Sequence, residues 1–96
     1  MNLQPARHSP RDSREPSLHE LAPFRFDGLT IEVRVAVLRG EDGVWRGRLA
    51  FVGGADGPDV TRETAEIFCA ATEAELWQSV QGLGTHHVRD LYRSLL

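Results

Sequence analysis

Alternating hydrophobic residues mark two strands in the middle of the chain. From residue 31 to residue 37 the apolar positions are Ile31, Val33, Val35 and Val37. From residue 45 to residue 51 they are Trp45, Gly47, Leu49 and Phe51. A period of two is typical of a strand with one buried face. The pattern therefore predicts two half-buried strands joined by the turn Gly40-Glu41-Asp42-Gly43.

Two registers of this hairpin keep the apolar faces together, because residues directly opposite share a face. One register sets Arg34 opposite Arg48, two like charges. The other uses residues 41–43 as a three-residue loop, with Gly43 in the left-handed region, and sets Arg34 opposite Ala50. This loop is a common type I turn followed by a bulge. We therefore predict the second register. Its pairs are Val37 with Gly47, Val35 with Leu49, and Val33 with Phe51.

A weaker third strand is predicted near Glu63–Cys69, after a loop rich in glycine and aspartate at residues 53–59. We expect one face to carry Ala65, Ile67 and Cys69 and to point toward the core. The other face would carry Thr64, Glu66 and Phe68.

The C-terminal segment carries the signals of a helix. Thr72 followed by Glu75 forms a capping box. An apolar stripe at helical spacing then runs through Trp77, Val80, Gly84, Val88, Leu91 and Leu95, flanked by Leu76, Leu83 and Tyr92. Gly82 and Gly84 leave two alternatives: one helix from Glu73 to Leu95, or a break with Thr85 capping a second helix. Because the stripe keeps its phase across the glycines, we favour one helix, with Gly84 making the closest contact with the sheet.

The predicted fold class is α+β. We expect a three-stranded antiparallel meander with one C-terminal helix packed on one face, in the order β-β-β-α. Residues 1–23 contain four prolines, mixed charges and few large apolar groups. Such a segment cannot bury enough surface to offset its ordering entropy. It is predicted to be a disordered tail, and residues 24–96 a single domain.

One helix can cover only one face of this sheet, so the opposite face is predicted to be an interaction surface. A helix over Glu73–Leu95 would be roughly 34 Å long, about the length of one strand. The opposite face mixes arginines with apolar groups, which is more typical of an interface than of a solvated exterior. The predicted interaction residues are Arg34, Ala36, Leu38, Arg46, Arg48, Val52 and Phe68.

Composition narrows the context of this domain. Cys69 is the single cysteine, which excludes a disulfide within the chain and fits a reducing compartment. No apolar run approaches the ~20 residues that span a bilayer, and we expect a cytoplasmic protein with no membrane partner. All eleven basic residues are arginine, a bias typical of bacterial-like, GC-rich coding sequences. The net charge of −3 does not favour a nucleic-acid partner, which would need a local basic patch.

Few side chains point to catalysis or metal binding. Cys69 with His86 or His87 is the one combination that would serve a small thiol or hydrolytic enzyme. A buried Cys69 acting as a small hydrophobic group is the preferred reading. His86 and Asp90 share a helical face, but two ligands do not make a zinc site, and we expect Asp90 to pair with Arg93. No catalytic residue, metal or cofactor is predicted.

The order of strands followed by a helix resembles the layout of HicB-like antitoxin domains from Thr30 to about Val80. The strand that those domains place after the helix is missing. A double-stranded-RNA-binding domain shares three strands and a helix, but it needs a basic start to that helix, where this chain has Thr72-Glu73-Ala74-Glu75. We assign the chain to neither family.

The expected function is that of a small non-catalytic protein-interaction module. It would form a homodimer, or dock on another protein, through the open sheet face. The alternative is a nucleic-acid-associated regulator, antitoxin-like in layout, that uses Arg34, Arg46 and Arg48.

Overall fold

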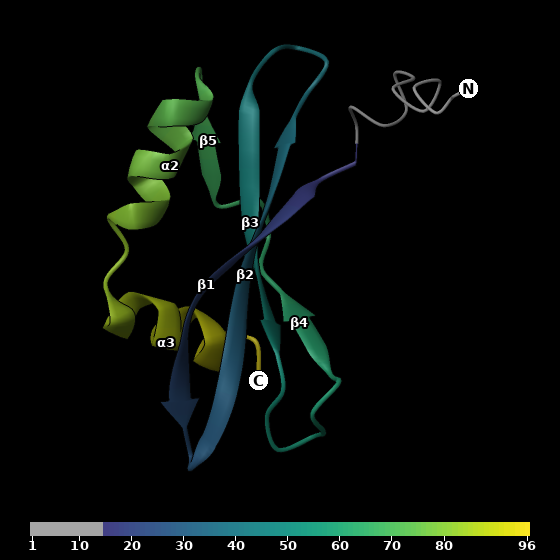
Figure 1. Cartoon of the computed structure of the whole chain (residues 1–96), viewed down its shortest axis with the longest axis vertical. Helices are drawn as coiled ribbons and strands as arrows, with labels where there is room; N and C mark the ends of the chain where they lie inside the picture. The colour runs from purple at the N-terminus through teal and green to yellow at the C-terminus, as the bar shows by residue number, and fades with distance from the viewer. Residues whose placement is uncertain (1–14) are drawn as a thin grey trace, which may run out of the picture.

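The computed structural model describes residues 15–96 as an antiparallel sheet with two helices on one side (Figure 1). The strands are β1 (Ser17–Phe26), β2 (Leu29–Arg39), β3 (Trp45–Val52), β4 (Thr61–Glu63) and β5 (Phe68–Ala70). The helices are α2 (Glu73–Gln81) and α3 (Thr85–Ser94). The α+β class is confirmed. The β-β-β-α order is wrong, because a strand precedes the hairpin, the third strand is split, and the helix is divided.

The central hairpin of β2 and β3 has the predicted register. Val37 pairs with Gly47, and Arg34 lies opposite Ala50. The turn closes with a 2.9 Å hydrogen bond from the Gly40 N–H to the Val44 carbonyl, and Gly43 has a φ of 82°. A left-handed residue at this position is what a type I turn with a bulge requires, and glycine adopts it without steric cost.

The prediction of a disordered tail is wrong for residues 17–23. These residues form most of β1, which pairs antiparallel with β2. Residues 1–14 of the predicted tail lie outside the described residues. Asp27 and Gly28, with φ values of 53° and 81°, form the two-residue turn between the strands. Pro23 fits because the register shifts between Leu21 and Phe24, and proline is tolerated at such bulges on an outer strand.

The predicted third strand is interrupted at its centre. β4 pairs with the end of β3, and β5 pairs with its beginning. Thr64 bridges the gap, because the Leu49 N–H donates to Thr64 Oγ1 at 3.0 Å and the Thr64 N–H donates to the Leu49 carbonyl at 2.9 Å. The main chain of Leu49 is thus satisfied without a continuous partner strand.

Two helices replace the single helix that we favoured. Thr72 caps α2 as expected, its hydroxyl accepting a 3.2 Å hydrogen bond from the Glu75 N–H. The chain then breaks after Gln81, at the alternative position, but Gly84 rather than Thr85 occupies the N-cap of α3. Gly84 does not make the predicted close contact with the sheet, since the atoms nearest to a Cβ added there belong to the side chains of His86 and His87. Leu83, between the two glycines, packs against the core.

The core lies between the helices and one face of the sheet. Its buried members are Phe24, Ile31, Val33, Val35, Val37, Leu49, Phe51, Phe68, Leu76, Val80 and Tyr92. Leu76 and Val80 face the sheet most fully, whereas Trp77, expected to start the buried stripe, is only partly buried. Tyr92 of α3 makes edge-to-face contacts with Phe24, Phe26 and Phe51, with ring centroids 5.1 to 5.7 Å apart.

Gly54 makes room for the hydroxyl end of Tyr92. Its φ is 117°, and an added Cβ would collide with the tyrosine oxygen. Gly28, at φ 81°, offers a matched control because nothing lies near its missing Cβ. We expect Gly28→Ala to cost about 1–2 kcal/mol from backbone strain alone. Gly54→Ala should cost about 1–3 kcal/mol more, from overpacking against Tyr92 and from the greater backbone strain of an alanine at φ 117°.

Urea unfolding of both variants measures this difference. Equal decreases in the free energy of unfolding for the two variants would show that the hydroxyl end of Tyr92 moves aside freely.

Candidate functional site

The sheet face turned away from the helices gathers six of the seven predicted interaction residues. Because strand residues alternate, the register places these residues on one side of β2 and β3. They are Arg34, Ala36, Leu38, Arg46, Arg48 and Val52. Leu18 and Glu20 of β1, Glu63 of β4 and Cys69 of β5 extend the same surface. We call this surface the open face, since neither α2 nor α3 lies over it (Figure 1).

Phe68 does not belong to the open face. It lies opposite Gly47, on the helix side of the sheet, and is 5% exposed. Phe68 and Cys69 were therefore assigned to the wrong faces. Cys69 is exposed on the open face, and Ile67 is 42% exposed. The physical reason is that Phe68, the largest apolar group of this segment, fills the space that Gly47 leaves beneath α2.

The three arginines of the open face each have an acidic partner. Arg34 pairs with Glu32 at 3.4 Å, and Arg48 with Glu63 at 3.5 Å. The buried Nε of Arg48 has no hydrogen-bond partner, so its contact with Glu63 is an ion pair without a hydrogen bond. The face therefore has local charge pairs rather than a basic patch.

Arg46 and Asp42 tie the hairpin turn to the open face. Arg46 Nη2 donates to Asp42 Oδ2 at 2.8 Å, and the Val44 N–H donates to Asp42 Oδ1 at 3.0 Å. The hydrogen bond from Arg46, supported by that from Val44, lowers the pKa of Asp42 from its usual 3.8 to about 2. The carboxylate of Asp42 is thus held ionised as the acceptor of both donors.

This lowered pKa predicts how the turn responds to acid. Because the folded pKa lies below the unfolded value, the contribution of Asp42 to folding is complete above about pH 4 and is lost as the pH falls toward 2. We expect the carboxyl carbon of Asp42 to titrate near pH 2 by NMR. In Arg46→Met the midpoint should rise toward 3.8. A parent midpoint at the ordinary aspartate value would contradict the ion pair.

The residues considered for thiol chemistry do not converge. Cys69 lies on the open face, whereas His87 lines a groove on the helix side with Ile67 and Phe68. The rings of His86 and His87 lie beside each other, with centroids 4.1 Å apart. The structure thus brings the two histidines together but places the thiol on the other side of the sheet.

Within residues 15–96, no three histidine, cysteine or carboxylate side chains gather closely enough to hold a metal ion. Asp90, considered as a ligand beside His86, accepts a 3.2 Å hydrogen bond from Arg93, as the sequence predicted.

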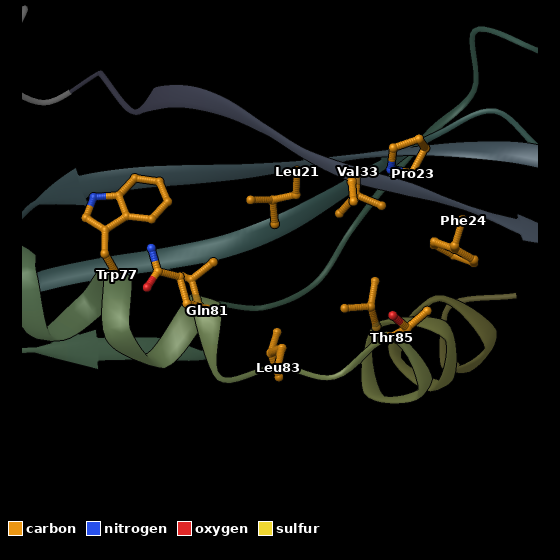
Figure 2. A pocket seen from close by; sticks show the side chains of 11 residues that line it. Leu21, Pro23, Phe24, Val33, Trp77, Gln81, Leu83 and Thr85 are labelled. Atoms are coloured by element: carbon orange, nitrogen blue, oxygen red, sulfur yellow. The ribbon is translucent and has the colours of Figure 1, made fainter.

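An apolar groove that sequence reasoning missed lies between β1 and the helix pair. It has a volume of about 260 Å³. Figure 2 shows Leu21 and Val33 pointing from the sheet toward the helices, and Trp77 rising from α2 toward β1. Its full lining is Leu21, Ala22, Pro23, Phe24, Val33, Trp77, Val80, Gln81, Leu83, Thr85 and Val88. The groove exists because the bulge of β1 and the break between the helices lie opposite each other.

Two contacts fix the indole of Trp77 at the end of this groove. Trp77 Nε1 donates to Glu73 Oε2 at 3.2 Å. The ring meets His19 of β1 edge to face, with centroids 4.9 Å apart. Trp77 is thus an amphipathic wall of the groove, with its polar nitrogen held outside the core.

No protein-family model matches the chain, and neither a curated protein nor a solved structure is significantly similar to it. Neither α2 nor α3, the helices of residues 15–96, has the length and hydrophobicity of a membrane-crossing helix.

Proposed function

We propose that this protein is a non-catalytic interaction module that associates with a second copy of itself through the open face. The observation that carries the proposal is a broad sheet surface over which no helix of residues 15–96 lies. Leu18 on this surface is 60% exposed, and Leu38 and Val52 are partly exposed. Apolar groups set among ion pairs on an uncovered sheet are typical of a protein-binding surface.

The charge balance favours a protein partner over a phosphate backbone. Three of the eleven arginines and one of the fourteen acids precede residue 15, which leaves eight arginines against thirteen acids in the described part. The arginines of the open face are also engaged by carboxylates. A phosphate backbone would have to displace these carboxylates and approach an acidic domain.

A second copy fits because the open face is self-complementary in charge. Arg34 and Arg48 lie near its middle, with Glu20 on the β1 side and Glu63 on the β4 side. A two-fold axis through the face sets the carboxylates of one copy beside the arginines of the other, which would add to the ion pairs within each copy instead of displacing them. Such charge complementarity determines how the two copies align more than how tightly they bind. The affinity comes from burial of the apolar groups. The buried surface also adds to the core of a small domain.

Light scattering after size exclusion tests the proposal. We expect the parent to be a dimer and the double variant Leu38→Glu, Val52→Glu to be a folded monomer. These positions avoid the core, because both side chains are only partly buried. Leu96→Glu is the control for an added negative charge, since it places one glutamate at an exposed leucine away from the open face. The control should remain dimeric.

Two results would overturn the proposal. A parent that is monomeric at high concentration removes self-association. A dimer that persists in the double variant places the interface elsewhere. Retention of the parent on a nucleic-acid column that weakens with salt would instead support the regulator, because phosphate contacts depend strongly on ionic strength.

A further inference from the structure

The outer edge of β1 has main-chain groups that no described strand pairs with. The strand order is β1-β2-β3-β4, so β1 ends the sheet. The Gly40 N–H donates to the Val44 carbonyl, so these two residues form a hydrogen-bonded pair at the end of the β2–β3 ladder. Because hydrogen-bonded pairs recur every second residue, the even-numbered residues of β2 bond to β3 and the odd-numbered ones to β1. The N–H and C=O groups of Leu18 and Glu20 therefore point outward.

The opposite edge of the sheet is not equally available. β4 and β5 have three residues each, and residues 64–67 interrupt them. Short and broken edge strands resist the addition of another strand. On β1, Pro16 and Pro23 bound a regular stretch, residues 17–21, before the bulge. This stretch is the one place in the described part where a further strand has a straight template.

The apolar groove lies along this same edge, on the helix side. Leu21 and Pro23 of β1 form one wall, and Trp77 and Val80 of α2 form the other. A strand added outside β1 turns alternate side chains toward the helices. One of these side chains would meet the groove, whose volume of about 260 Å³ is lined mainly by apolar residues (Figure 2). Main-chain pairing and a pocket for alternate side chains together define strand addition as a binding mode.

The other side of the same edge is acidic. Glu20 is exposed there, beside a second hollow that it shares with Glu32 and Arg34. Arg34 is engaged by Glu32, which leaves the carboxylate of Glu20 at the outer rim. The side chains of an added strand that turn away from the helices therefore meet negative charge.

We propose that the edge of β1 binds an extended segment of a partner protein in which apolar and basic residues alternate. The main chain pairs with Leu18 and Glu20, an apolar side chain enters the groove, and basic side chains face Glu20. This site shares Glu20 with the open face but depends on the main chain of β1 and on the groove of the helix side, so the monomeric Leu38→Glu, Val52→Glu variant should still bind the segment.

The test uses a capped seven-residue peptide with leucine at alternate positions and arginine between them. Two control peptides have the same sequence but carry N-methyl groups, either on amides that pair with β1 or on amides that point away from it. NMR titration of the full chain should shift the amides of Leu18, Glu20 and Trp77. Methylation on the pairing side should weaken binding about tenfold or more, because hydrogen bonds are lost and the strand cannot approach. Methylation on the far side should leave the affinity unchanged.

A pair of protein variants tests the same edge from the other side. Leu18→Pro removes an outward N–H without touching a bond to β2, and proline is tolerated on such an edge. Leu18→Ala keeps the N–H and is the control. We expect the proline variant to lose peptide binding and the alanine variant to retain it, with similar melting temperatures. If the proline variant does not fold, the methylated peptides still decide the question.

Three outcomes would overturn the inference. Equal affinity for the two methylated peptides would mean that charge alone attracts the arginines. Shifts confined to the amides of Arg34, Arg46 and Arg48 would move the site to the open face. A parent dimer that only Leu18→Pro dissociates would show that a second copy, rather than a foreign strand, occupies the edge.

Discussion

Packing of one face of the β2–β3 hairpin against Leu76, Val80 and Tyr92 is the interaction on which the other features depend. The hairpin presents an unbroken row of apolar side chains to the helices. Burying that row uses both α2 and α3, since α2 covers β5 and the start of β3 while α3 lies across β1 (Figure 1). No further helix in the described part is left for the other side, so the open face follows directly from how the core is built.

The hairpin could be predicted because its signals agree at every level. Alternation, charge placement and turn chemistry all favour one register, and Gly43 permits the one backbone conformation that this register needs. β1 was missed because its first four residues are exposed and carry little periodicity, and because Pro23 argues against a strand. Asp27-Gly28, a strong signal for a two-residue hairpin, was available in the sequence and would have pointed to a partner for β2.

The errors near the C-terminus have a different origin. The apolar stripe from Trp77 to Leu95 keeps its phase across Gly82 and Gly84, so periodicity cannot distinguish one helix from two. In the third strand, the single large residue Phe68 outweighs three smaller ones in choosing the buried face. The groove could not be predicted at all, because it depends on a bulge in β1 that lies opposite a helix break more than fifty residues later.

The exchange between Thr64 and Leu49 has a consequence for the growth of the sheet. By satisfying the main chain of Leu49 with one side chain and one amide, Thr64 lets the outer strand be divided into β4 and β5 without leaving the centre of β3 unpaired. The two margins of the sheet therefore differ, since β1 is regular over residues 17–21 whereas the opposite margin is divided into two three-residue strands. If β1 binds a strand as we propose, the far margin offers no straight template of the same length, so edge-to-edge addition would stop at a finite complex instead of propagating as a fibril.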